Sequence, residues 1–295
     1  MKSVSIIGAA TLAALLAAPL PARQQQHQRL AAGPADKSAT TLSYGPDRLQ
    51  TLDFYRATAP RAPLVVFVHG GGWKRGDKSM MRGSDKLKDW QGKGYAVASL
   101  NYRLVPDARV EDQAADVAAA VALLKRQAGA LGIDGERIVL VGHSAGAHLV
   151  TLVGTDPQWL RGAGLGMDAV RGIVALDGAG YDVPSQMKAN QRLMGDTYEQ
   201  AFGTDPARQK ALSPTLQAQA PNAPAFLILY VQRADSKTQS EGLAKALRAG
   251  GTPSETQQIP GRGIKGHMEI NRRLGDASYP ATAIVDAWLA RLFRS

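Results

Sequence analysis

Short apolar stretches that alternate with helix-forming stretches constrain the fold of this chain more than any other feature of its sequence. Five of them are rich in β-branched residues: PLVVFVH at 63–69, YAVASLNY at 95–102, RIVLVGH at 137–143, GIVALDG at 172–178 and AFLILYV at 225–231. Such stretches are typical of strands buried on both faces of a parallel sheet. Helix-forming sequence lies around them, at about 77–91, 108–130, from 144, 238–249 and 280–293. The alternation predicts an α/β fold with a mostly parallel sheet and helices on both faces.

Weaker strand signals extend this pattern at both ends. TLSY and TLDFY are separated by the turn sequence GPDR and are interpreted as an opening hairpin, and ETQQIP at 255–260 is a late strand. The predicted sheet therefore has about eight strands. Residues 179–222 lie between two strands and are too many for a bare connection, so they predict a small helical insertion. The insertion is expected over the C-terminal edge of the sheet, where ligands bind in such folds.

The N-terminal residues differ from the rest of the chain. Residues 1–22 begin with one lysine, continue through an Ala- and Leu-rich stretch and end in small residues and prolines. This layout is typical of a signal peptide, with Leu20 and Ala22 flanking the cleavage site, and it predicts an exported protein, periplasmic or secreted. Residues 23–38 are polar and are interpreted as a flexible tail. One α/β domain is then expected over 39–295.

Charge and cysteine content exclude several classes of function. The formal net charge is +10, but the lysines and arginines are scattered and are not interleaved with aromatic residues. We interpret this as a solvated basic surface and expect no nucleic-acid partner and no stable membrane insertion of the mature chain. The chain contains no cysteine, which excludes disulfides and thiolate catalysis. No feature of the sequence predicts an oligomeric state.

The sequence GHSAG carries the strongest chemical indication. It places Ser144 in G-x-S-x-G order, directly after a predicted buried strand and before a predicted helix. A serine on such a tight turn is lifted out of the sheet at the positive end of the helix, and only glycines two residues to either side let the chain pass so closely. A helix-capping serine gives a similar pattern. The preceding strand favours a nucleophile.

A glycine run follows an earlier strand in HGGGW, where Gly70, Gly71 and Gly72 come after His69. A glycine loop can aim backbone N–H groups at the negative charge that develops during acyl transfer. Three glycines often form a plain turn. The tight strand-to-helix turn at Ser144, a serine elbow about 70 residues later, favours an oxyanion hole instead. We expect Gly71, Gly72 and Ala145 to form it, although the sequence leaves open which of the three glycines donate.

Taken together, HGGGW, ASLNYRLVP and GHSAG occur in the order seen in a known family. From about residue 40 to its end, the chain resembles the α/β-hydrolase esterases, in particular the bacterial branch related to hormone-sensitive lipase and kynurenine formamidase. The resemblance implies the α/β-hydrolase fold and a serine nucleophile assisted by a histidine and an acidic residue. It also implies that no cofactor takes part.

The general base follows from the positions of the five histidines. In this fold the acid and the histidine come after the serine, which excludes His27, His69 and His143. His148 lies on the helix that begins at the serine and is expected to point into its packing, which leaves His267. His69 is expected to hold the glycine loop. A spacing of five does not place His143 and His148 on one helical face, so no metal site is predicted.

The acidic partner is less constrained by the sequence. Asp235 lies just past a predicted buried strand and before a helix, where members of the family carry their acid. It would accept a hydrogen bond from His267 and stabilise the imidazolium. As a loop aspartate it could instead cap the next helix. Asp182 is the main alternative and Asp205 the third.

The region around His267 also matches a cofactor-binding pattern. Gly261, Gly263 and Gly266 match the spacing of dinucleotide-binding loops. That reading requires a strong preceding strand and a following βαβ unit, whereas only 35 residues remain and no further strand is predicted. The glycines are therefore interpreted as part of a loop that brings His267 to Ser144.

The predicted activity is hydrolysis of carboxylic esters with small or short acyl groups, through an acyl-enzyme. An amidase or formamidase with the same residues is the first alternative. A non-catalytic binding protein on the same fold is the second. The expected partner is a small-molecule ester.

Overall fold

In the computed structural model, residues 39–189 and 191–294 are described. The predicted signal peptide and the predicted tail lie outside the described residues. No helix in the described part of the chain is both long and apolar enough to cross a membrane.

A single mixed sheet organises the described residues. Its eight strands there are β1 (Thr40–Ser43), β2 (Thr51–Tyr55), β3 (Ala62–Val68), β4 (Ala96–Leu100), β5 (Ile133–His143), β6 (Gly172–Leu176), β7 (Phe226–Gln232) and β8 (Ser254–Arg262). Their order is β1-β2-β4-β3-β5-β6-β7-β8. Strands β3 to β8 run parallel, whereas β1 pairs with β2, and β2 with β4, in antiparallel fashion. The predictions of a mostly parallel sheet of about eight strands and of an opening hairpin are confirmed.

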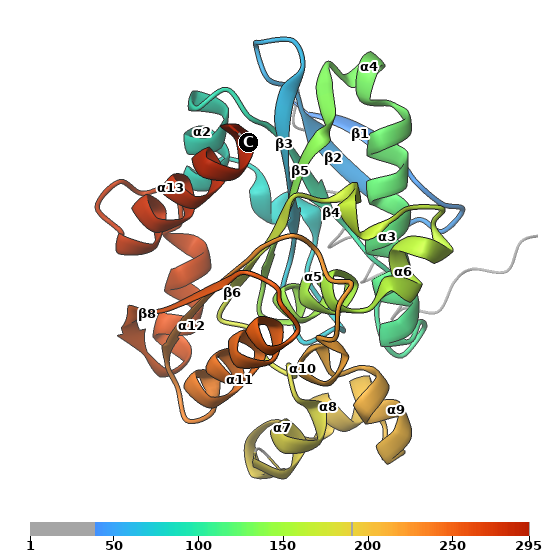
Figure 1. Ribbon diagram of the computed structural model, residues 1–295, viewed down its shortest axis with the longest axis vertical. Helices are drawn as coiled ribbons and strands as arrows, with labels where there is room; N and C mark the ends of the chain where they lie inside the picture. The colour runs from blue at the N-terminus through green and yellow to red at the C-terminus, as the bar shows by residue number, and fades with distance from the viewer. Residues whose placement is uncertain (1–38, 190, 295) are drawn as a thin grey trace, which may run out of the picture. The chain divides into compact units, whose positions relative to one another are not determined.

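Helices cover both faces of the sheet. They are α2 (Asp85–Gly92), α3 (Val110–Arg126), α4 (Ala128–Leu131), α5 (Ala145–Thr155), α6 (Pro157–Gly162), α7 (Val183–Ala189), α8 (Gln191–Phe202), α9 (Pro206–Ala211), α10 (Pro214–Gln217), α11 (Ser236–Ala249), α12 (Gly263–Arg272) and α13 (Pro280–Arg294), with short 3₁₀ helices η1 (Lys78–Met81) and η2 (Met167–Ala169). Figure 1 shows α3 and α6 on one side of the sheet and α2 and α13 on the other.

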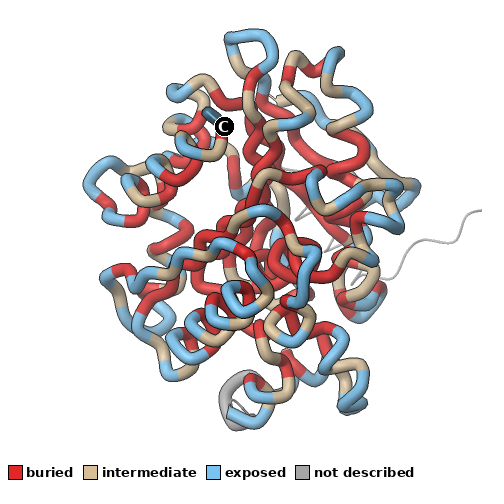
Figure 2. Tube along the Cα trace, in the orientation of Figure 1, coloured by how far each residue is buried: buried red, intermediate tan, exposed pale blue. Residues whose placement is uncertain are grey.

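The core is divided by the sheet into two apolar layers. Along β3, Leu64 and Val66 face the layer that α3, α5 and α11 cover, whereas Val65 and Phe67 face the layer covered by α2, α12 and α13. Successive side chains of a strand point to opposite faces, so a strand of continuous apolar residues is buried on both. Figure 2 shows the central strands as mostly buried.

The segment between β6 and β7 forms the helices α7 to α10, which gather at the bottom of the view in Figure 1. Two aromatic residues of α8, Tyr198 and Phe202, pack against Trp73, with ring centroids 5.9 and 4.8 Å from the Trp73 ring. Trp73 follows the C-terminal end of β3. The insertion therefore covers this edge of the sheet beside the glycine loop.

The chain after β8 differs from the sequence-based expectation. His267 lies within α12, and not on a loop, so the prediction of a glycine-rich loop is wrong. Gly263, with φ of +56°, is the first residue of α12, and β8 ends at the residue before it. A Cβ added to Gly266 would lie 2.6 Å from the carbonyl carbon of Gly261. These glycines therefore allow an abrupt strand-to-helix turn, and no strand follows α12 in the described part of the chain.

Candidate active site

Ser144 lies on a sharp turn between β5 and α5. Its φ and ψ are 55° and −119°, a conformation that a residue with a side chain rarely adopts. An added Cβ at Gly142 would lie 2.2 Å from the carbonyl oxygen of Gly146, and one at Gly146 would lie 2.2 Å from that of Val68. Both positions therefore require glycine, as the spacing of the motif indicated, and the turn presents Ser144 Oγ at the edge of the sheet.

His267 lies beside this serine. Its Nε2 is 3.1 Å from Ser144 Oγ, although 123 residues separate them in the sequence. The residue comes from α12, which follows β8, three strands away from β5 in the sheet. The predicted nucleophile and the predicted base are thus within hydrogen-bond distance of each other.

The acid beside His267 is Asp177, not Asp235. Asp177 Oδ2 is 2.6 Å from His267 Nδ1, and the aspartate is fully buried. It is the first residue after β6, with φ of +44°. The prediction that Asp235 accepts this hydrogen bond is corrected. Asp177 had a sequence signal, because it directly follows the buried stretch GIVAL on the strand adjacent to β5.

The structure shows why Asp235 does not contact His267. Its carboxylate accepts a hydrogen bond from the Gln186 amide of α7, and it lies 3.6 Å from the Arg233 guanidinium. Asp235 is also the residue before α11. The Arg233 side chain is directed to Asp177, so the end of β7 supplies the site with a cation in place of an acid.

The two other aspartates considered as acids have structural contacts of their own. Asp182 accepts a hydrogen bond from the Ser185 amide, and Asp205 caps α9 through the amides of Ala207 and Arg208.

Asp177 is held by three donors. His267 Nδ1 and Arg233 Nε, the latter at 2.7 Å, both contact Oδ2, and the amide of Val231 donates to Oδ1 at 3.1 Å. Burial raises the pKa of the Asp177 carboxyl, but the hydrogen bond from His267 and the positive charge of Arg233 outweigh burial, so this pKa lies below its ordinary value. Asp177 therefore stays ionised, and the contacts from the end of β7 and from α12 restrain its position.

The glycine loop lies directly against the serine. A Cβ on Gly70 would lie 2.9 Å from the Cβ of Ser144, and Gly71 and Gly72 line the same cavity as Ser144. Ala145 is the first residue of α5, so its amide belongs to the N-terminus of that helix. The predicted oxyanion-hole residues are thus gathered around the hydroxyl, and their role stays a prediction.

His69 and His148 hold the glycine loop and the Trp73 side chain that follows it. His69 Nδ1 donates to the carbonyl of Gly70 at 2.9 Å, and its ring stacks on Tyr102 with centroids 4.4 Å apart. His148 Nε2 donates to the carbonyl of Leu212 at 2.9 Å, while its Nδ1 accepts from Trp73 Nε1 at 3.3 Å. Both imidazoles are therefore structural, as the sequence suggested.

His143 has a contact that sequence reasoning missed. Its Nε2 donates to the backbone carbonyl of His267 at 2.9 Å, and the two rings lie with centroids 4.6 Å apart. Burial, and then the neighbouring His267, lower the pKa of His143 to about 3. The variable position of the serine elbow thus places a neutral imidazole that ties α12 to β5.

Acid is expected to destabilise the protein between about pH 6.5 and pH 4. An unfolded histidine has a pKa near 6.5, whereas burial lowers the pKa of His69 and of His148 to about 4 in the folded protein. In this window the unfolded chain binds more protons than the folded one. The free energy of unfolding therefore decreases as the pH is lowered, by up to about 1.4 kcal/mol per pH unit for each buried histidine. Urea unfolding at pH 7, 6 and 5 measures the effect. An unchanged midpoint would contradict it.

Ser144 and His267 open into a cavity of about 450 Å³. Its wall includes the glycine loop, Trp73 and Tyr198. Within the described residues, no group of three or more His, Cys, Asp or Glu side chains could hold a metal ion.

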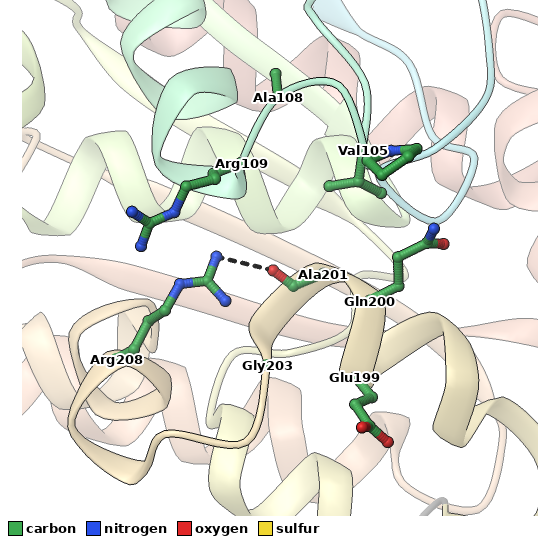
Figure 3. Close-up of a pocket in the computed structure, with 9 residues that line it drawn as sticks. Val105, Ala108, Arg109, Glu199, Gln200, Ala201, Gly203 and Arg208 are labelled. Atoms are coloured by element: carbon green, nitrogen blue, oxygen red, sulfur yellow. Dashed lines mark hydrogen bonds between the residues drawn. The ribbon is translucent and has the colours of Figure 1, made fainter.

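A separate cavity of about 330 Å³ lies between the start of α3 and the helices α8 and α9. Figure 3 shows Arg109 and Arg208 facing each other across it, with Arg208 donating to the carbonyl of Ala201. Arg208 also makes two hydrogen bonds of 2.7 Å to the Glu111 carboxylate, which compensates its charge. Neither Ser144 nor another predicted site residue lines this cavity.

Known proteins similar to this chain include esterases. Residues 52–163 match the protein-family model BD-FAE. The chain is 31% identical over 202 residues to esterase LipC of Mycobacterium tuberculosis. The matched region covers 64% of this chain and 49% of LipC. It is also 32% identical over 149 residues to kynurenine formamidase of Meyerozyma guilliermondii. That matched region covers 50% of this chain and 54% of the formamidase. The chain thus spans about half the length of these curated relatives.

Among solved structures, esterase B from Lactobacillus Rhamnosis superposes with a TM-score of 0.70 at 22% identity, over 92% of this chain and 90% of that one. The chain has the α/β-hydrolase fold, as predicted, and its predicted resemblance to esterases of this fold is confirmed.

Proposed function

We propose that the protein is a serine hydrolase that cleaves carboxylic esters through a covalent acyl-enzyme. One observation carries the proposal: a continuous line of hydrogen-bond distances runs from Ser144 Oγ to His267 Nε2 (3.1 Å) and from His267 Nδ1 to Asp177 Oδ2 (2.6 Å). A nucleophile, a base and a group that orients the base are the three parts that acyl transfer by serine requires.

In the first half of the reaction, Ser144 Oγ attacks the ester carbonyl while its proton passes to His267 Nε2. Asp177 keeps the Nδ1 proton in place and stabilises the imidazolium that forms. The negative charge that develops on the carbonyl oxygen is met by amides from Gly71, Gly72 and Ala145. Collapse of the tetrahedral intermediate breaks the ester C–O bond, and His267 gives its proton to the leaving alcohol.

In the second half, water replaces the alcohol. His267 removes a proton from this water, the hydroxide attacks the acyl carbonyl, and the proton returns to Ser144 Oγ as the carboxylic acid leaves. No other reactant is needed. Because Asp177 is buried and fully hydrogen-bonded, it stays an anion throughout and acts only by orienting and stabilising His267.

A second candidate activity has support from one relative. Part of the chain is similar to a kynurenine formamidase, and the same three residues can cleave amides. The similarity to LipC, whose name is esterase, covers more of this chain and favours esters.

The test is a substrate panel measured with the full chain. The 4-nitrophenyl esters of acetate and butyrate are expected to turn over at least about tenfold faster than the palmitate ester, because a 450 Å³ cavity has little room for a long acyl chain. Formanilide and N-formylkynurenine serve as the amide arm. Negligible ester turnover beside amide cleavage would favour the formamidase, and a steady rise toward palmitate would contradict a short-acyl preference.

Export from the cytoplasm is part of the proposal. It is supported by the layout of residues 1–22, in which Leu20 and Ala22 flank the expected cleavage site. Fractionation with mass spectrometry of the N-terminus decides it, since an uncleaved protein in the cytoplasm would exclude export.

A further inference from the structure

A second cavity adjoins the one that contains Ser144. It also has a volume of about 450 Å³, and both cavities are lined by Met80 of η1 and by Met268 and Asn271 of α12. The two methionines are half exposed, at 45% and 50%. Two adjoining cavities that share flexible methionine side chains can accept a molecule that occupies both, because such side chains adapt to the shape of a ligand.

The walls of this double cleft are basic. The part around Ser144 contains Lys74 and Arg75, and no Asp or Glu is among the described residues that line it. The second part contains Lys86 and Arg272, and also Arg82, whose charge is compensated by the buried Asp53 at 3.2 Å. The single carboxylate that lines this second part, Asp85, is about half exposed and lies 3.8 Å from the Lys88 ammonium. A cleft with walls of one sign concentrates ligands of the opposite charge.

Two buried polar side chains line the second cavity. Lys86 is only 3% exposed, and its Nζ donates to the backbone carbonyl of Asn271 at 3.0 Å while lying over the Phe67 ring. Burial lowers the pKa of Lys86 to about 8. The side-chain oxygen of Asn271 is buried, with no hydrogen-bond partner among the described residues. A buried cation without a carboxylate contact is stabilised by an anionic ligand, whereas the Asn271 oxygen can only accept and so takes no part in binding a carboxylate.

The position of His267 determines which end of an ester reaches this cavity. His267 protonates the leaving alcohol, so the alcohol oxygen must face His267 Nε2. The same helix, α12, carries Met268, Asn271 and Arg272 in the positions after that histidine, and all three line the second cavity. The second cavity therefore lies on the alcohol side of the scissile bond.

We infer that the protein selects esters whose alcohol part carries a carboxylate, which passes the Met80–Met268 pair and is bound between Lys86 and Arg272. The inference rests on the proposed ester hydrolysis and adds a substrate class to it. Hydrolysis of such an ester consumes one water and releases the acyl acid and a hydroxy acid.

The experiment compares matched acetate esters that differ only in charge. One pair is 4-carboxyphenyl acetate and its 4-carbamoyl analogue, and a longer pair carries a carboxyvinyl or carbamoylvinyl group in the same position. The value of kcat/KM for each is divided by its rate of hydroxide hydrolysis, which removes differences between the leaving groups. The anionic ester is expected to be preferred about fivefold or more in at least one pair, and the preference to fall at 0.5 M salt.

Variants on α12 show whether the second cavity causes the preference. Arg272→Gln is expected to lower the ratio of anionic to neutral ester by about threefold. Lys265→Gln removes the same charge from an exposed position of α12 that lines neither cavity, and it should leave the ratio unchanged. Lys86→Met should lower the ratio as well, provided that circular dichroism shows a folded protein.

The outcomes are separable from those of the proposed function. A ratio near one in both pairs, or equal effects of the two α12 variants, would overturn the inference while ester hydrolysis stands. If the protein cleaved none of the four esters and also failed to cleave 4-nitrophenyl acetate, the proposed function would instead be overturned.

Discussion

Replacing Asp177 by asparagine is expected to lower kcat for 4-nitrophenyl acetate by about 10⁴-fold with little change in KM. An asparagine amide can donate to His267 Nδ1, which fixes the wrong tautomer and removes the anion that stabilises the imidazolium. Initial rates over a range of substrate concentrations measure both constants. Because the change also leaves Arg233 without its buried anion, circular dichroism must show that the variant is folded.

Asp235→Asn is the matched control for this prediction. Both aspartates contact Arg233, but the Asp235 carboxylate accepts a hydrogen bond from Gln186 of α7, whereas that of Asp177 accepts one from His267. Its loss is expected to lower kcat by less than about tenfold. A larger effect at Asp235 than at Asp177 would contradict the geometry of the site and restore the acid position typical of the family.

Replacing Ser144 by alanine is expected to lower kcat by about 10⁶-fold, because no other hydroxyl is in contact with His267 in the described residues. The wild-type protein should form an acyl-enzyme with 4-nitrophenyl acetate, seen by mass spectrometry as an added acetyl group on the peptide that contains Ser144. The variant should show none.

Ser278→Ala serves as a control for this loss. Ser278 is exposed in the turn before α13 and contacts only Arg273 and Asp276 among the described residues. Turnover by this variant should equal that of the wild type. Acetylation that persists in Ser144→Ala would show that another residue is the nucleophile.

Local patterns predicted the parts of the site that depend on local geometry. The elbow around Ser144 needs a strand, two glycines and a helix within a few residues, and all of these are visible in RIVLVGHSAGAHL. His267 could be identified because few histidines follow the serine. The order of buried strands likewise predicted the sheet, since strands buried on both faces are continuous apolar runs.

The acid could not be chosen in this way, because its identity depends on contacts across strands. Asp177 and Asp235 both follow a buried strand, and both strand ends lie near His267. The end of β7 instead directs the side chain of Arg233 to Asp177 and to the carbonyl of Gly178. Nothing in the sequence around either aspartate reports the direction of that side chain.

The helix α12 was missed for a different reason. Glycines at 261, 263 and 266 disfavour a helix by intrinsic propensity and led to the prediction of a loop. In the structure, the close approach of Gly261 and Gly266 requires the absence of a side chain at the strand-to-helix turn. Tertiary contact therefore outweighed propensity.

The helical setting of His267 has a consequence for the energetics of turnover. A histidine on a free loop loses conformational entropy each time it is ordered against the serine, and that loss adds to the barrier of the reaction. Here α12 and the hydrogen bond from His143 order the backbone of His267 when the chain folds, and Asp177 orders its imidazole. The entropic cost of placing the base is therefore met once, during folding, and not in each catalytic cycle. The binding energy of the substrate can then be used to orient the ester.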